Sequence, residues 1–249
     1  MKRRVVAAIL CSLLATPALA VEDLVSGLSQ DTVEISSNYT GTDITVFGAI
    51  EHLEDTGAND IVVVVRGPGT DMTVRKKDRV AGIWINRDQA KLFDMPSYYY
   101  LASTRPIDRL AAGDTLQRYG IGLAHITPGR VASHHDPEPF RLALVRHLQQ
   151  QGLYGEAAGG VEFLSPTLFR AHVPVPASVP RGQYNAEVYL LRDGTVISAQ
   201  STPLFIDQTG LERRLYNFAH NSPLSYGLST VLMAILLGWI SSLIFRNND

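Results

Sequence analysis

The densest group of residues able to bind a metal is the run His134-His135-Asp136-Pro137-Glu138. Two imidazoles beside carboxylates can hold a divalent cation. Neighbouring side chains in a loop converge poorly, however, and Asp136 and Glu138 also suit the start of a helix, as a cap and a first-turn acid. His134 and His135 are therefore candidate metal ligands, with a helix start as the alternative.

Enzyme motifs are absent from the sequence. It has no G-x-S-x-G elbow, no H-E-x-x-H, no phosphate-binding P-loop and no dinucleotide fingerprint. A Ser/His/Asp triad assembled from distant positions stays open. Trp84 and the run Tyr98 to Tyr100 either line a ligand groove or pack a core on one face. The sequence favours a protein without catalysis and predicts no cofactor.

The two apolar ends predict where the protein is placed. Residues 1–20 have the order of a secretory signal peptide, with three basic residues, a short apolar run and the small-x-small site Ala18-Leu19-Ala20. Residues 222–245 are long enough for one transmembrane helix, since about 20 apolar residues cross the hydrocarbon core. We expect an exported domain anchored in a membrane by one helix, with residues 246–249 as a cytoplasmic tail.

Small side chains recur every four residues along the C-terminal helix, at Thr230, Ala234, Gly238 and Ser242. Helices in lipid associate where small residues let their backbones approach closely. The stripe predicts docking on a second transmembrane helix, either of a partner protein or of another copy in a homo-oligomer. Chance spacing is the alternative.

Cysteine usage and charge narrow the function further. The single cysteine, Cys11, lies in the predicted signal peptide, so the mature chain has no disulfide and no thiol nucleophile. Without the three basic residues of that peptide, 19 Lys and Arg face 24 Asp and Glu, a formal net charge of −5. An acidic domain argues against a nucleic-acid partner.

Strand patterns dominate residues 21–206, which we expect to form one periplasmic domain. The β-branched run Ile61 to Val65 predicts a central strand buried on both faces. The charged run Arg75 to Arg79 predicts the turn of a β-hairpin. Between about residues 105 and 160 the apolar spacing becomes helical, which predicts a helical insertion.

The insertion contains one well-defined helix pattern. Asp136-Pro137 predicts its start, and Gly152 can close it. Phe140, Leu144 and Leu148 fall on one face at a spacing of four, which is typical of a helix packed on a core.

Tyr184 follows a Pro/Gly corner and precedes a strand with alternating apolar residues. This order is that of a tyrosine corner, in which the phenol hydroxyl bonds back to the upstream backbone. Together with the number of short strands, it predicts an immunoglobulin-like β-sandwich. A generic turn beside a core tyrosine is the alternative.

A short amphipathic helix is predicted for residues 207–221, directly before the membrane. Thr209-Gly-Leu-Glu212 has the form of a capping box, and Leu211, Leu215 and Phe218 share one face. Such a helix would lie on the membrane surface or against the domain. A flexible stalk is the alternative.

Three stretches together resemble an uncharacterised family of alphaproteobacterial transmembrane proteins. They are LSQDTVEISSNYTGTDITVFGAI (residues 28–50), PRGQYNAEVYLLRDG (residues 180–194) and the terminal apolar helix. The resemblance covers nearly the whole mature chain and implies no known activity. Members of that family are often encoded beside permeases of the sulfite-exporter type, so it implies an inner-membrane permease as a candidate partner.

The function predicted from these features is a membrane-anchored periplasmic accessory module that binds a membrane partner. Two alternatives stay open. One is a membrane-tethered hydrolase with an unrecognised site, and the other is a periplasmic binder of a metal or small ligand through His134 and His135.

Overall fold

The computed structural model describes residues 24–36, 39–51, 59–80, 82–208 and 218–246. The predicted signal peptide, most of the predicted amphipathic helix at 207–221 and the last three residues of the tail lie outside this part of the chain. The described residues are mainly β, as predicted, with several sheets and one C-terminal apolar helix.

The larger sheet of the sandwich has six strands in the order β2-β13-β12-β4-β7-β9. Its strands are β2 (Thr32–Ile35), β4 (Asn59–Arg66), β7 (Tyr99–Ser103), β9 (Tyr154–Ala158), β12 (Gly182–Arg192) and β13 (Thr195–Gln208). The two outermost pairs, β2 with β13 and β7 with β9, are parallel. Strand β4 lies inside the sheet, and every residue from Ile61 to Val65 is at most 2% exposed. The predicted buried central strand is therefore confirmed.

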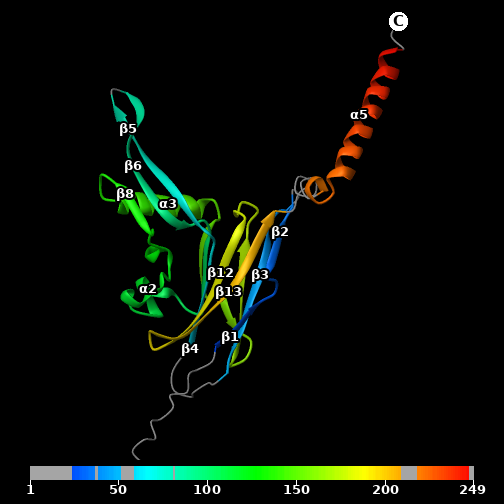
Figure 1. Ribbon diagram of the computed structural model, residues 1–249. Coiled ribbons are helices and arrows are strands. Elements are labelled where there is room, and N and C mark those ends of the chain that lie inside the picture. The colour runs from blue at the N-terminus through cyan, green and yellow to red at the C-terminus, as the bar shows by residue number, and fades with distance from the viewer. Residues whose placement is uncertain (1–23, 37–38, 52–58, 81, 209–217, 247–249) are drawn as a thin grey trace, which may run out of the picture.

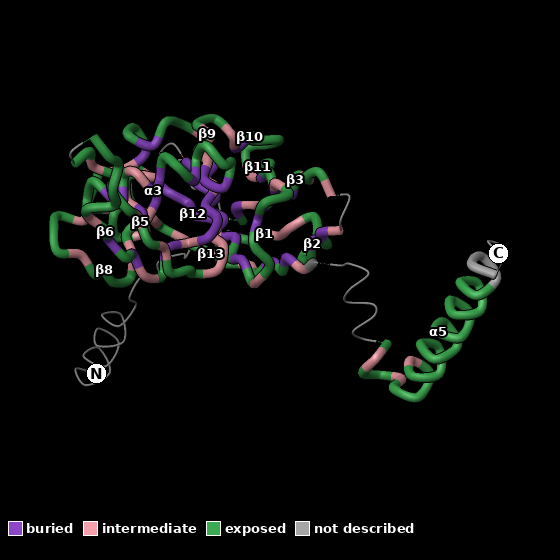
Figure 2. Tube along the Cα trace, turned by 90° about the horizontal axis from the view of Figure 1, so that it is seen from above, coloured by how far each residue is buried: buried purple, intermediate pink, exposed green. Residues whose placement is uncertain are grey.

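The smaller sheet has four strands in the order β1-β3-β11-β10. They are β1 (Leu24–Leu28), β3 (Thr42–Ile50), β10 (Val161–Phe163) and β11 (Leu168–Val175). Alternate residues of β3 and β11 are buried, which is the pattern of strands with one face on a core. Buried residues of this sheet and of the six-stranded sheet form one cluster. Figure 2 colours the buried residues purple along the trace. The immunoglobulin-like assignment of this sandwich stays a prediction.

A long hairpin projects from the sandwich (Figure 1). It consists of β5 (Gly69–Val80) and β6 (Ile83–Pro96), and β8 (Arg130–Ser133) pairs with its base as a third strand. The predicted hairpin exists, but its predicted turn is wrong. Arg75 to Arg79 lie within β5, and the strands reverse between Val80 and Ile83, where Gly82 has a φ of +87°. A positive φ favours glycine, which places the turn at this residue.

The segment at 105–160 combines helices with two strands. Its helical elements are η1 (Ile107–Arg109), α2 (Gly113–Tyr119), η2 (Leu123–His125) and α3 (Glu138–Gln150). Strand β8 joins the hairpin and β9 joins the six-stranded sheet, so the insertion is less purely helical than predicted.

Helix α3 buries the predicted face of Phe140, Leu144 and Leu148. It begins at Glu138 with Pro137 in the cap position, one residue later than predicted. The carboxylate of Asp136 still accepts a hydrogen bond from the Glu138 amide, at 3.1 Å. Glycine 152 follows the helix with a φ of +71°, the conformation that ends helices.

Helix α5 (Pro223–Arg246) is apolar on every side. Within the described residues, one stretch is long and apolar enough to cross a membrane, residues 223–242 of this helix, and none of it is buried. Figure 2 shows the helix exposed along its described length.

Candidate sites on the domain and the apolar helix

His134 and His135 lie in the loop between β8 and α3, and both are exposed. The Nδ1 atom of His135 lies 3.8 Å from an Oδ1 atom of Asp88 on β6. Its backbone carbonyl accepts a hydrogen bond from the Ser133 hydroxyl at 2.8 Å. Among the described residues, no three His, Cys, Asp or Glu side chains gather as a metal site would require. Metal binding by His134 and His135 stays a prediction.

Tyr184 is fully buried at the start of β12. Its hydroxyl donates a hydrogen bond of 2.5 Å to the carbonyl oxygen of Pro180, four residues upstream. The ring packs against Tyr98, with the ring centroids 5.9 Å apart. Burial raises the pKa of Tyr184, so the phenol is neutral and available as a donor. The residue is placed to fix the corner that leads into β12.

Arg66, at the end of β4, forms an ion pair with Glu187 of β12. Its Nη2 atom also donates to the carbonyl oxygens of Tyr119, at 2.7 Å, and Gly120, at 3.0 Å. Burial opposes the charge on the guanidinium and is the largest single influence, but Glu187, Tyr189 and Tyr99 together outweigh it, and the pKa of Arg66 is raised. This cation therefore satisfies the carbonyls left at the C-terminal end of α2.

Tyr99 completes the attachment of α2 to the sheet. Its hydroxyl donates to the Gly120 carbonyl at 3.0 Å and accepts from the Gly122 amide at 2.8 Å. Sequence reasoning missed this network because its members are far apart, with Arg66 and Glu187 separated by 121 positions. The charges of Arg66 and Glu187 are paired with each other, and the network connects the C-terminal end of α2 to the sheet.

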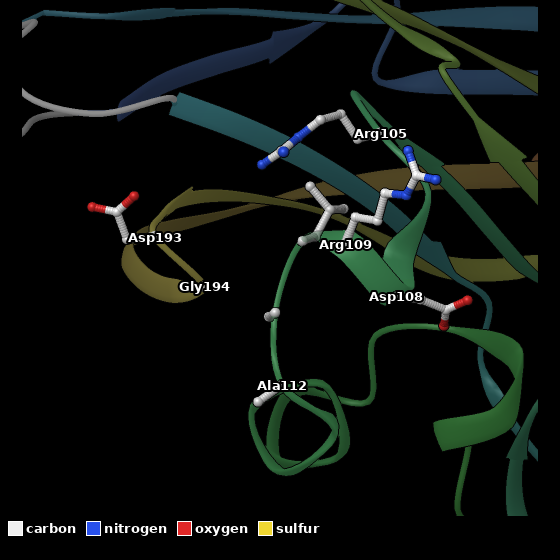
Figure 3. A pocket seen from close by; sticks show the side chains of 8 residues that line it. Arg105, Asp108, Arg109, Ala112, Asp193 and Gly194 are labelled. Atoms are coloured by element: carbon white, nitrogen blue, oxygen red, sulfur yellow. The ribbon is translucent and has the colours of Figure 1, made fainter.

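An open hollow of about 460 Å³ lies beside η1 and the turn between β12 and β13 (Figure 3). Arg105 and Asp193 lie at its rim. The guanidinium of Arg105 is paired with the buried carboxylate of Asp60, with an Nε to Oδ1 distance of 2.8 Å. One of the two guanidinium groups that line the hollow is therefore already paired, and Arg109 supplies the other.

The four aromatic residues, for which the sequence left a ligand groove or core packing open, are separated in the structure. Tyr98 and Tyr99 are buried in the core, and Tyr100 is half-buried. Trp84 lies near the end of the hairpin, with 65% of its surface exposed. A groove shared by these four residues is therefore wrong.

The predicted stripe of α5, Thr230, Ala234, Gly238 and Ser242, is exposed throughout. The Thr230 hydroxyl donates to the carbonyl oxygen of Gly227 at 2.8 Å, so its polar group is satisfied within the helix. A Cβ atom added at Gly238 would meet no atom within 4 Å. Whether the stripe binds another helix stays a prediction.

Comparison with known protein families gives a match over most of the chain. A family model described as "Putative transmembrane protein (Alph_Pro_TM)" matches residues 23–247, which is most of the chain. No curated protein matches the chain significantly.

Proposed function

Since the chain belongs to the Alph_Pro_TM family of transmembrane proteins, we propose that it is a membrane-anchored accessory module of the bacterial inner membrane. Its β domain lies in the periplasm after removal of the signal peptide, and α5 crosses the membrane once. The module acts by binding a membrane partner. The hydrolase and the metal or small-ligand binder stay hypotheses.

The strand order supports an immunoglobulin-like domain as the periplasmic part. The smaller sheet runs β1-β3-β11-β10, and the larger sheet contains β13-β12-β4. These orders correspond to the ABED and GFC sheets of that fold. The hydrogen bond from Tyr184 to Pro180 lies where a tyrosine corner places it, just before the last two strands. Such a fold supports many functions, so the function itself depends on the sites.

The observation that carries the proposal is the stripe of small residues at a spacing of four, which has Leu232, Met233, Leu236 and Leu237 to its sides. Each of its side chains is exposed, and Gly238 leaves open space at the helix surface. In lipid, a leucine surface gives helices little reason to associate, whereas small residues allow close backbone packing. The stripe is therefore the face that we assign to a partner helix, which is either an inner-membrane permease or a second copy of this chain.

The test compares two substitutions on the same helix. Gly238→Ile fills the stripe, and Leu236→Ile changes a side chain off the stripe while keeping its volume. A Cβ atom added at Gly238 meets no other atom of this chain within 4 Å. A loss of binding in Gly238→Ile would therefore reflect a clash with the partner helix. Gly238→Ile should abolish co-purification of the partner from membranes in mild detergent, and Leu236→Ile should leave it unchanged. Equal behaviour of the two variants would show that α5 is only an anchor.

A further inference from the structure

The end of the β5–β6 hairpin exposes large apolar side chains to solvent. Ile83 is 68% exposed and Trp84 is 65% exposed, and Val80 and Ile85 are each more than 40% exposed. We call residues 75–88 the hairpin tip. Isolated exposed apolar residues are ordinary, but a tryptophan and three aliphatic residues grouped on one projecting tip indicate a binding surface.

Apolar side chains leave the tip on both of its faces. Residues directly opposite one another in an antiparallel pair share a face, and the face alternates along each strand. Val80 lies opposite Ile83, whereas Trp84 lies opposite Arg79 on the other face. A flat protein surface would cover one face and leave the other wet. A fluid lipid interface surrounds both faces, and tryptophan is enriched at that interface.

The hairpin tip is basic although the whole chain has a formal net charge of −2. Its charged residues are Arg75, Lys76, Lys77, Arg79 and Arg87 against Asp78 and Asp88, which gives a local net charge of +3. Hydrogen bonds from the Arg79 amide and the Arg87 side chain lower the pKa of Asp78. Asp78 is therefore charged at neutral pH and contributes one negative charge to this sum. A basic tip matches an anionic lipid surface.

The two lysines of the tip are available for such a surface. Within the described part of the chain, neither Lys76 nor Lys77 forms an ion pair within 4 Å, and both are exposed. The acidic residues are engaged elsewhere, since Asp78 pairs with Arg87 at 3.1 Å and Asp88 faces His135.

The base of the hairpin is built to hold the tip in place. Strand β8 pairs with β6 from Ala90 to Phe93, and Leu92 and Met95 are fully buried there. The Phe93 ring lies between two cations, with the Arg130 guanidinium 4.1 Å and the Lys91 ammonium 4.5 Å from its centroid. The base of the hairpin is thus stabilised as a three-stranded sheet, and the hairpin continues beyond that sheet as the two strands β5 and β6.

The hairpin and the membrane anchor leave the domain at the same end. Strands β4 and β13 both run antiparallel to β12, so they point in the same direction. The hairpin follows Arg66 at the end of β4, and the chain toward α5 follows Gln208 at the end of β13. In Figure 1 the hairpin rises from the end of the sandwich at which β13 finishes. The tip therefore faces the side from which the anchor departs.

The available lengths allow the tip to reach the membrane. The twelve residues of β5 span about 40 Å. Asn185 of β12 pairs with both Arg66 of β4 and Pro203 of β13, so these two residues lie at the same height in the sheet. Beyond Pro203, β13 continues for five residues, which span about 17 Å. The 14 steps from Arg66 to Val80 span at most about 46 Å, so the tip extends at most about 30 Å beyond β13. The 15 steps from Gln208 to Pro223 can span at most about 50 Å, whatever their conformation.

We propose that the hairpin tip docks on the membrane that α5 crosses. Trp84 and Ile83 enter the boundary between headgroups and acyl chains, and Lys76 and Lys77 contact anionic lipid headgroups. The inference rests on α5 spanning the bilayer, as the proposed function requires, but it does not depend on any partner helix. Two attachment points would fix the tilt of the domain over the membrane, which a single anchor leaves free.

Tryptophan quenching in the full-length protein tests this directly, because the chain has two tryptophans, Trp84 and Trp239. Trp239→Phe leaves Trp84 as the only reporter. In nanodiscs rich in phosphatidylglycerol, its emission should shift to the blue and be lost when the lipid is brominated near the glycerol. The matched protein with Trp84→Phe reports through Trp239 whether α5 is inserted.

Charge variants separate lipid docking from other contacts. Each cation near an anionic surface contributes roughly fivefold to membrane binding, so Lys76→Gln with Lys77→Gln should weaken docking by roughly 25-fold. Arg118→Gln, which removes an exposed cation from α2 outside the hairpin, should leave it unchanged. Quenching of Trp239 without quenching of Trp84 would overturn the inference. Trp84 emission that changes only when other membrane proteins are added would overturn it too, and would indicate a protein partner at the tip.

Discussion

Replacing Tyr184 by phenylalanine removes one oxygen atom and leaves the buried ring in place. The lost hydroxyl donates a 2.5 Å hydrogen bond to the Pro180 carbonyl oxygen. A neutral hydrogen bond contributes about 1 kcal/mol, and stranding a buried partner raises the cost to as much as about 3 kcal/mol. Pro180 is exposed, so water can reach its carbonyl group after the substitution. We therefore expect a loss of about 1 kcal/mol in the free energy of unfolding.

A loss of this size is measurable by thermal unfolding. For a domain of this size, about 1 kcal/mol lowers the Tm by about 2–4 °C. Circular dichroism at a wavelength dominated by strands follows the β domain of the full-length protein in mild detergent. Tyr100→Phe is the matched control, because the same oxygen is removed from a half-buried tyrosine whose hydroxyl bonds to no described residue. Equal Tm values for Tyr184→Phe and Tyr100→Phe would refute the assignment of Tyr184 as a stabilising corner.

Three further outcomes are expected. Gly48→Ala should lower the denaturant midpoint by the equivalent of about 1–3 kcal/mol, because its Cβ would lie 2.5 Å from the buried Phe169 ring; an unchanged midpoint would contradict this packing. The hydrogen bond from Arg141 lowers the pKa of Glu138 in the folded protein. The carboxylate of Glu138 therefore contributes to folding stability above its ordinary pKa, and this contribution is lost as the pH falls through the lowered pKa. Glu138→Gln should therefore reduce the fall of the Tm in acid, and an identical pH profile would exclude this role. Residues 21–220, exported without α5, should purify as a folded soluble monomer; an unfolded circular dichroism spectrum would show that the domain boundary is wrong.

Local patterns predicted the central strand and the main helix of the insertion. The run Ile61 to Val65 is buried on both sides, and α3 buries the face that its spacing indicated. Both predictions succeeded because the pattern of apolar residues follows burial: it is continuous in a strand buried on both faces, and it recurs every three to four residues in a helix with one buried face. The turn of the hairpin was predicted at Arg75 to Arg79 because charged residues are common in turns. Strand β5 instead continues to Val80, and Gly82, with its positive φ, lies in the reversal.

Long-range pairing was outside the reach of sequence patterns. Nothing local to Arg66 indicates that Glu187 lies beside it, or that Tyr99 holds the end of α2. The hairpin tip was visible only as a tryptophan and a charged run. The apolar side chains on both faces of the tip result from the register of β5 and β6, which places Trp84 and the aliphatic residues on opposite faces. Its direction depends on β4 and β13 being parallel in space.

Cysteine labelling measures the central claim, a single exported domain held by one C-terminal helix. The only native cysteine is Cys11, in the predicted signal peptide, so the mature chain offers a clean background. Ser178→Cys places a thiol on an exposed loop of the domain, and Asn248→Cys places one in the tail. In cells with a permeabilised outer membrane, a membrane-impermeant maleimide should label Ser178→Cys at once and Asn248→Cys only after detergent is added. Labelling of the tail with protection of the domain would contradict the account.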